Sequence, residues 1–160
     1  MKLYINQRVF SIGDKYDVYN ENDEAVLQVE SEIFTIGARI HILDASGNEI
    51  YYIKQKLKLF LAEYEIYSGD NLLANVIQEF SFFNKNISIE SVYGSYRIEG
   101  DLFGMDFDII KDGRLFGSVS KKWLSFGDSY ELYIPDEADY AFFAALVIAI
   151  DNCIHNENRG

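Results

Sequence analysis

The chain has 160 residues and a mass of 18.4 kDa, the size of one ordinary domain, so we expect a single domain over residues 1–160. Apolar residues make up 49% of the chain, aromatic residues 16% and charged residues 25%, a composition that excludes intrinsic disorder. One proline and eleven glycines without a period exclude the collagen-like and low-complexity classes.

Acidic residues dominate the charge. The 14 Lys and Arg residues stand against 26 Asp and Glu residues, which gives a formal net charge of −12. Nucleic-acid binders neutralise phosphates with clustered cations, so a sequence pI near 4.5 excludes a nucleic-acid partner. The same charge argues against general attachment to anionic membranes and is typical of a soluble protein.

Cysteine usage and apolar runs indicate a cytoplasmic protein without an integral membrane segment. Cys153 is the only cysteine, so no disulfide forms within the chain. The segment Met1–Arg8 has no apolar run of a secretory signal. The longest apolar run, Tyr140–Ile150, is eleven residues, whereas a membrane-spanning helix needs about 20.

Most of the chain alternates apolar and polar residues between turn signals, which is typical of short antiparallel strands. Turn residues separate the runs, as in Ser46-Gly47-Asn48 and Lys111-Asp112-Gly113. About twelve strands on one core predict a barrel or a sandwich. The predicted strands are Arg8–Ile12, Lys15–Asn20, Ala25–Glu30, Arg39–Asp44, Glu49–Lys54, Leu61–Tyr67, Leu72–Phe80, Asn86–Glu90, Tyr96–Glu99, Met105–Ile109, Arg114–Ser120 and Tyr130–Ile134.

The C-terminal segment breaks this pattern and predicts a helix. Pro135 ends the last strand, and Asp136 is the expected N-cap, with Glu137 and Asp139 near the positive end of the helix. The run Tyr140–Ile150 has no polar face, and a helix that is apolar all round is buried all round. A helix packed flat on a sandwich would keep a polar stripe, so we expect a closed barrel around a central hydrophobic helix. Small residues would let the strands approach it closely: Ala141, Ala144, Ala145 and Ala149.

An internal repeat supports the closed barrel. When the chain is shifted by 66 residues, His41–Tyr67 aligns with Phe107–Tyr133, turn against turn. We interpret the match as internal pseudo-symmetry. The identical pairs are Gly47/Gly113, Lys56/Lys122, Phe60/Phe126, Tyr64/Tyr130, Glu65/Glu131 and Tyr67/Tyr133.

Several segments together resemble the LURP-one-related family, which is similar in fold to the tubby C-terminal domain and to phospholipid scramblases. They are Gly104–Ile109, Lys121-Lys122-Trp123, Asp128–Leu132 and the apolar helix that follows Asp139. The resemblance covers the chain in length and element order, and it implies a twelve-stranded barrel around a hydrophobic helix. Tubby domains bind phosphoinositides through basic side chains. Those positions cannot be matched to lysines or arginines here, so that activity is not carried over.

Acidic, histidine and cysteine residues form no convergent site in the sequence. Asp106 and Asp108 share one strand face but lack a third group, so we interpret them as a solvated face. His41 is expected to face outward or to hydrogen-bond across a strand. Asp151 and His155 lie at i,i+4 spacing around Cys153, without the further ligands of a zinc site, so we predict a surface histidine and a buried or half-buried thiol.

Motifs for cofactors and catalysis are absent from the sequence. It contains no P-loop, no nucleophile elbow and no dinucleotide fingerprint, and the turn Asp44–Glu49 lacks the alternating acids of an EF-hand. We therefore expect no enzymatic activity, no cofactor and no metal.

Basic residues are the remaining candidates for a site. Lys54, Lys56 and Lys58 alternate along one predicted strand, and Lys121 and Lys122 occupy the repeat-equivalent place. These five cations are the candidate anion-binding residues. Alternatively, lysines at these places protect strand ends against edge pairing.

The sequence favours a non-enzymatic cytoplasmic binding or scaffold domain whose ligand is a protein or a small molecule. The alternative is a lipid- or phosphoinositide-associated module of the tubby or scramblase type, and a carboxylate-based hydrolase is the third hypothesis. Peripheral membrane contact is not expected, because five lysines give only a modest attraction and the one strongly apolar segment is assigned to the core.

Overall fold

The computed structural model describes residues 1–6, 15–59, 61–79, 86–124 and 127–155. Within this part of the chain, twelve strands are followed by a single helix. The elements are β1 (Lys2–Asn6), β2 (Lys15–Asn20), β3 (Ala25–Ser31), β4 (Arg39–Asp44), β5 (Glu49–Lys56), β6 (Glu63–Ser68), β7 (Asn71–Glu79), β8 (Asn86–Ser91), β9 (Gly94–Asp101), β10 (Asp106–Lys111), β11 (Arg114–Leu124), β12 (Gly127–Tyr133) and α1 (Tyr140–His155).

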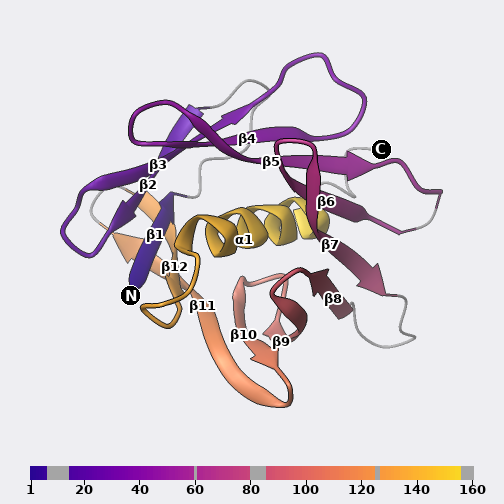
Figure 1. Ribbon diagram of the computed structural model, residues 1–160. Helices are drawn as coiled ribbons and strands as arrows, with labels where there is room; N and C mark the ends of the chain where they lie inside the picture. Colours follow the sequence, from indigo (N-terminus) through magenta and orange to yellow (C-terminus); the bar gives the residue numbers. More distant parts are fainter. Residues whose placement is uncertain (7–14, 60, 80–85, 125–126, 156–160) are drawn as a thin grey trace.

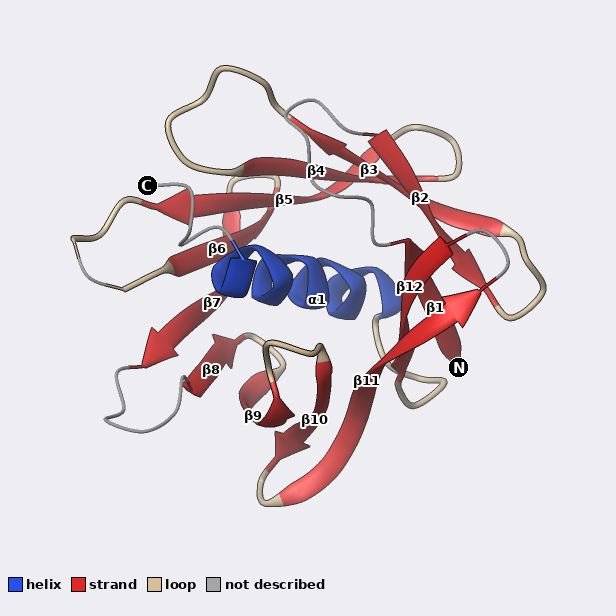
Figure 2. Cartoon of the chain, turned by 180° about the vertical axis from the view of Figure 1, so that it is seen from behind, coloured by secondary structure: helices blue, strands red, loops and turns tan. Residues whose placement is uncertain are grey.

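The strands form a closed antiparallel barrel in which each strand pairs with its neighbours in the sequence (Figure 1). β12 closes the barrel by pairing with β1, with Leu132 opposite Leu3. Figure 2 shows from behind that the strands surround α1. The predicted fold class, a mainly β barrel of about twelve strands around a central helix, is confirmed.

Alternating burial explains why these segments are strands. In β10, for example, Phe107 and Ile109 are buried while Asp106 and Asp108 are exposed, because successive side chains point to opposite faces. One inward residue on most strands is fully buried, and nearly all of these residues are β-branched, which suits a pleated wall. They are Val18, Val29, Ile42, Ile53, Ile66, Val76, Ile89, Ile109 and Leu132.

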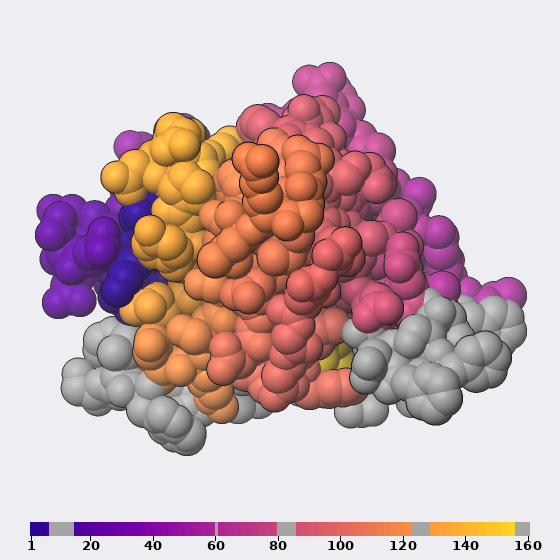
Figure 3. All heavy atoms as spheres, turned by 90° about the horizontal axis from the view of Figure 1, so that it is seen from below, coloured from indigo at the N-terminus to yellow at the C-terminus, as the bar shows by residue number. Residues whose placement is uncertain are grey.

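The helix α1 fills the barrel. Every residue from Ala141 to Ile150 is at most 4% exposed, as the unbroken apolar run predicts. Figure 3 shows a wall of strands that hides nearly all of the helix, and only a small yellow area of its C-terminal part is visible. Among the described residues, no helix is long and apolar enough to span a bilayer.

Several predicted strand boundaries differ from the structure by one to four residues, and one strand was not predicted. The first strand of the barrel is β1, which was not predicted, and the predicted strand Arg8–Ile12 lies outside the described residues. β1 escaped prediction because it is only five residues long and stands at the chain terminus, without a turn signal before it. β5 ends at Lys56 rather than Lys54 and β6 begins at Glu63 rather than Leu61, so the loop between them lies two residues later than predicted.

The N-cap of α1 is Asp139, not Asp136. The Phe142 N–H donates to Oδ1 of Asp139 at 3.0 Å, and the Phe143 N–H donates to the Asp139 carbonyl at 3.1 Å. Asp136 instead accepts a hydrogen bond from the ammonium group of Met1 at 2.6 Å. The cap lies later than predicted because residues 135–139 form a turn before the helix starts.

The internal repeat extends to the pairing of strands. Gln55 faces Tyr64 between β5 and β6, and Lys121 faces Tyr130 between β11 and β12, each at the 66-residue offset. Gly47 and Gly113 both adopt a positive φ in the turn before β5 and β11. The β5–β6 and β11–β12 hairpins therefore pair in the same register.

The repeat also has a limit. Ile40 of β4 faces Ile53 of β5, and Phe107 of β10 faces Val119 of β11. The offset between the two copies is therefore 67 residues in the strand before the turn and 66 in the strand after it, because the second hairpin is one residue shorter. Tyr64 is the second residue of β6, but Tyr130 is the fourth of β12, so the two tyrosines stand at different distances from the starts of their strands. The pair Phe60/Phe126 lies outside the described residues.

Candidate functional site

The two ends of the barrel differ. Tight turns and the start of α1 form one end, which we call the turn end: 21–24, 45–48, 69–70, 92–93 and 112–113. At the opposite end, which we call the loop end, are the β3–β4 loop (32–38), the β5–β6 loop (57–62) and the C-terminal part of α1. Cys153 of α1 is 1% exposed, and its Sγ lies 4.0 Å from the Ala62 carbonyl oxygen.

Asp139 and aromatic rings close the turn end. Tyr51 of β5 and Tyr93 of the β8–β9 turn both donate to Oδ2 of Asp139, the latter at 3.0 Å. Burial, reinforced by the Asp139 carboxylate, raises the pKa of both phenols. The Phe142 ring packs edge-on against Tyr93, with centroids 4.8 Å apart. These contacts fix the helix to the wall and leave the carboxylate no role in ligand binding.

Asp151, Tyr130 and His155 form a second polar cluster, at the loop end. Asp151 is 2% exposed, and its Oδ1 accepts from the Tyr130 hydroxyl at 3.1 Å and lies 2.9 Å from Nδ1 of His155. The Asp151 contact raises the pKa of His155, although burial and Lys121 oppose the shift. The gap beside Asp151, lined also by Asn6 and Tyr16, is too narrow for a water molecule. The cluster therefore gives the buried Asp151 carboxyl group its polar partners and leaves no space for a substrate beside it.

The structure separates the two groups of candidate lysines. Lys54 and Lys56 lie on β5, and Lys58 follows the strand, which ends at Lys56. Lys121 and Lys122 lie on β11, six strands away around a twelve-stranded barrel in either direction. The two groups therefore lie on opposite sides of the wall and do not build one pocket, and anion binding by either group stays a prediction.

Glutamates accompany these lysines. Nζ of Lys56 lies 2.8 Å from Glu65 and 3.6 Å from Glu63, and Lys58 also contacts Glu63. Glu63 and Glu65 are only 5% and 6% exposed. Burial alone would raise the pKa of Glu65, but hydrogen bonds from Lys56 and Tyr67 outweigh it and lower that pKa. The contacts with lysines therefore offset the burial of these carboxylates.

The Lys–Glu pair recurs in the second half of the barrel. Nζ of Lys122 lies 3.9 Å from Glu131, at the same 66-residue offset from Lys56 and Glu65. Lys2 of β1 is 3.8 Å from the same carboxylate. The repeat therefore conserves a charge pair on the outside of the wall, which gives these lysines a structural role.

Exposed apolar side chains gather on the two loops of the loop end, and the sequence did not reveal them. Five of them form what we call the apolar rim: Ile33 (50% exposed), Phe34 (94%), Ile36 (79%), Leu57 (68%) and Leu59 (92%). The loops touch at their bases, because the Gln55 N–H donates to the Ala38 carbonyl at 2.9 Å and the Ala38 N–H donates to Oε1 of Gln55 at 2.9 Å. An exposed apolar group of this kind marks an interaction site.

The expectation against membrane contact assumed that no apolar segment is exposed, and the apolar rim corrects that assumption. The residues were missed because apolar periodicity does not separate a strand from a loop in short segments. A signal was present, since Ile33, Phe34 and Ile36 follow the end of a predicted strand and precede Gly37.

Phe34 carries backbone strain. Its φ is +59°, in the left-handed region, which is rare for a bulky residue. Its side chain gains no compensating burial, since it is 94% exposed. Strained residues persist where the surrounding structure imposes them, and they concentrate at functional sites.

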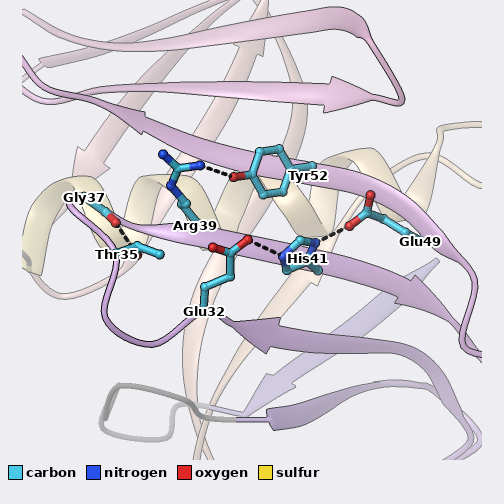
Figure 4. A network of polar contacts seen from close by, with 7 residues as sticks. All are labelled: Glu32, Thr35, Gly37, Arg39, His41, Glu49 and Tyr52. Atoms are coloured by element: carbon cyan, nitrogen blue, oxygen red, sulfur yellow. Dashed lines mark hydrogen bonds and ion pairs between the residues drawn. The ribbon is translucent and has the colours of Figure 1, made fainter.

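A polar network holds the base of the β3–β4 loop (Figure 4). His41 of β4 lies between two carboxylates, with Nε2 2.8 Å from Glu32 and Nδ1 in contact with Glu49 of β5. Arg39 donates to the Tyr52 hydroxyl at 3.3 Å, and the Thr35 hydroxyl donates to the Gly37 carbonyl at 2.9 Å. The predicted outward position of His41, with hydrogen bonds across strands, is confirmed.

Both ring nitrogens of His41 face carboxylate oxygens, an arrangement that favours the protonated imidazole, in which both nitrogens are donors. Burial lowers the pKa of His41, but the hydrogen bonds and charges of Glu49 and Glu32 outweigh it and raise the pKa above 6.5. The two carboxylates lie on opposite sides of the ring and do not converge on one nitrogen. The cluster is therefore a structural ion-pair network of His41, Glu32 and Glu49, which we call the His41 clamp.

The acidic pair predicted to be a solvated face lies on the outside of the barrel. Asp106 and Asp108 are exposed on the outside of β10, as expected for a solvated face. Among the described residues, no group of three or more His, Cys, Asp or Glu side chains is placed to hold a metal ion.

Comparisons with known proteins connect the chain to one family. The model of the LURP-one-related family matches residues 1–151. The chain is 32% identical to the uncharacterized protein YxjI of Bacillus subtilis (strain 168), over 98% of this chain and 96% of the relative. It is 23% identical to the protein LURP-one-related 14 of Arabidopsis thaliana, over 99% of this chain and 85% of the relative. An X-ray structure of an Arabidopsis thaliana protein is similar, with a TM-score of 0.63, 18% identity and coverage of 94% of this chain and 89% of the other.

Proposed function

Because the chain belongs to the LURP-one-related family, we propose that it is a non-enzymatic cytoplasmic binding or scaffold domain that engages its partner at the loop end of the barrel. The observation that carries this proposal is the contrast between a filled interior and an exposed apolar rim. α1 occupies the space in which many barrels hold a ligand, and its residues Ala141–Ile150 are buried. Binding must then use the outside, where Phe34 and Leu59 are more than nine-tenths exposed.

The rim supports a macromolecular partner better than a small molecule. Small-molecule sites are concave, whereas the rim consists of two adjacent loop tips. The open hollow beside Lys111, Arg114 and Phe116 lies at the turn end, away from the rim. The net charge of −12 continues to argue against a nucleic-acid partner.

Two alternatives receive less support. A phosphoinositide module of the tubby type would need unpaired clustered cations, but Lys56, Lys58 and Lys122 each contact a glutamate. A carboxylate-based hydrolase would need a cleft with convergent groups. The buried Asp151 beside His155 has no open space for a substrate.

Site-specific photocrosslinking tests the proposal. A photoreactive amino acid replaces Phe34 in one variant and Val92, 64% exposed at the turn end, in a matched control. In cells, adducts of protein or lipid should accumulate at position 34 and not at position 92. Equal labelling at the two positions would refute binding at the loop end.

A further inference from the structure

We propose that the apolar rim inserts into the interface of a lipid bilayer, so that the partner bound at the loop end is a membrane surface. This inference rests on the proposed function and names its partner. The driving force is burial of the rim side chains rather than recognition of a particular headgroup. Ile33, Phe34, Ile36, Leu57 and Leu59 supply the apolar surface.

The shape of the rim favours a bilayer over a protein. A closed barrel leaves no free strand edge in the described residues, so a partner cannot add a strand there. Two hollows formed by described residues lie beside Lys111 at the turn end and beside Asp151, and neither is lined by a residue of the rim. Protruding apolar tips enter a bilayer interface without needing a matching cavity.

The cations around the rim suit the same partner. Lys58 stands between Leu57 and Leu59, and Lys54 and Lys56 precede them on β5. Contacts with Glu63 and Glu65 hold the Lys56 and Lys58 ammonium groups close to the loop. Lysine stems can lie along apolar surface while their heads stay at the level of lipid phosphates. Three lysines face two glutamates, so this side of the loop end is not acidic.

Many acidic residues lie far from the rim, at the turn end of the barrel. Carboxylates occupy the tight turns of the turn end and the segment before α1: Glu21, Asp23, Glu24, Asp44, Asp70, Asp112, Asp136 and Glu137. At the loop end, Glu32 contacts His41, and Lys56 and Lys58 contact Glu63 and Glu65. Other acids at this end include Glu79, Asp101 and Asp106, on β7, β9 and β10. Because salt screens charges beyond about 8 Å at physiological ionic strength, the distant acids do not oppose insertion.

The strain at Phe34 points to the same use. A φ of +59° holds an exposed phenyl ring at the tip of the β3–β4 loop, although neither the backbone nor the ring gains stability there. Insertion of the phenyl ring into acyl chains removes its apolar surface from water, and this gain compensates for the strain of the backbone.

Vesicle sedimentation at physiological salt tests the inference. The wild-type protein should bind both phosphatidylcholine vesicles and mixed phosphatidylcholine/phosphatidylserine vesicles, with little change in high salt. The double substitution Phe34→Ser/Leu59→Ser should weaken binding about tenfold or more, because two apolar side chains are removed from the interface. The matched control Val92→Ser/Leu115→Ser removes two exposed apolar residues at the turn end, 64% and 66% exposed, and should leave binding unchanged.

Fluorescence gives an independent readout of insertion. Cys153 is buried, so an environment-sensitive dye attaches selectively to a cysteine introduced by Phe34→Cys. Its emission should shift to the blue on addition of either vesicle, and the same dye on Val92→Cys should not respond.

Three results would overturn the inference. The first is no vesicle binding by the wild type, and the second is equal loss of binding in the rim and control variants. The third is binding confined to anionic vesicles and removed by Lys54→Ala/Lys56→Ala, which would indicate an electrostatic lipid module. If the wild type does not bind vesicles but photocrosslinking at position 34 captures a protein, the loop end remains the binding site and only the lipid partner is refuted.

Discussion

Tyr51 and Asp139 are 88 residues apart in the chain, and the hydroxyl of Tyr51 donates to the carboxylate that caps the central helix. One oxygen of Asp139 accepts from the Phe142 N–H, while the other accepts from Tyr51 and from Tyr93. A single side chain thus ends the connection from β12, starts α1 and joins the helix to two separate parts of the wall.

The substitution Asp139→Ala should therefore destabilise the folded protein. It removes an N-cap, which contributes about 1 kcal/mol, and leaves two tyrosine hydroxyls without their acceptor, at about 1 kcal/mol each. We expect a loss of about 2–4 kcal/mol in the free energy of unfolding, measured by urea denaturation. Asp136→Ala is the matched control, since it removes only the contact of an 87% exposed side chain with the N-terminal ammonium. If the two variants are equally stable, Asp139 is not the cap.

The buried helix makes a second prediction. Ala145 is 0% exposed, so Ala145→Asp places a carboxylate without a partner inside the barrel. Such a change should cost several kcal/mol or prevent folding. The control Ala25→Asp introduces the same charge at an exposed position of β3. Circular dichroism melting should show a large fall for the first variant and a near wild-type transition for the second. An unchanged melting temperature of Ala145→Asp would exclude a central helix.

The sequence predicts the barrel well because the signals for its core are periodic. Residues such as Phe107 and Ile109 alternate with acids, and Tyr140–Ile150 has no polar face to place in water. The cap was misplaced because Asp136, Glu137 and Asp139 all carry suitable oxygens, and only the geometry of the preceding turn selects among them. Capping chemistry identifies the region of a helix start better than its residue.

The candidate site was less predictable. Whether Leu57 and Leu59 face the core or water depends on where β5 ends, and Lys54–Lys58 reads as one alternating strand in sequence. The pairing of Lys56 with Glu65 and the separation of β5 from β11 depend on strand order and register, which composition does not encode. The left-handed backbone of Phe34 has no sequence signal, because the residues that usually adopt it are glycine, asparagine and aspartate.

The His41 clamp predicts a pH dependence of stability. Its pKa is raised in the folded protein, so protonated His41 is favoured by folding. The stabilisation is complete below the unfolded-state pKa of about 6.5 and is lost as the pH rises through the raised folded-state value. The hydrogen bonds and charges of Glu49 and Glu32 cause the rise. Glu30, opposite His41 on β3, is paired with Lys15.

We expect the difference in unfolding free energy between the wild type and His41→Gln to shrink as the pH increases above about 6.5. Both proteins should be compared in a His155→Gln background, because the pKa of His155 is raised as well. NMR titration of the His41 ring gives the folded-state pKa directly. A value at or below 6.5, or a stability difference that does not vary with pH, would contradict the clamp.

Backbone strain at Phe34 predicts an unusual order of substitutions. At most positions glycine is less stable than alanine by about 0.5–1 kcal/mol, because it has more conformational freedom to lose. At φ +59° an alanine keeps the steric conflict of its Cβ, whereas glycine does not. Phe34→Gly should therefore be more stable than Phe34→Ala, by about 1 kcal/mol, although neither side chain makes contacts in this exposed place.

Ile36 supplies the matched control in the same loop. It is 79% exposed, and its φ is not positive, so Ile36→Gly should be less stable than Ile36→Ala. Thermal melts of the four variants measure both differences in one experiment. If glycine is more stable than alanine at position 34 but less stable at position 36, the β3–β4 loop holds the Phe34 backbone under strain. If glycine is the less stable residue at both positions, the Phe34 backbone is not strained. A Phe34→Gly variant that is more stable than Phe34→Ala, yet as deficient as it in vesicle binding, would show that the phenyl ring serves binding rather than folding.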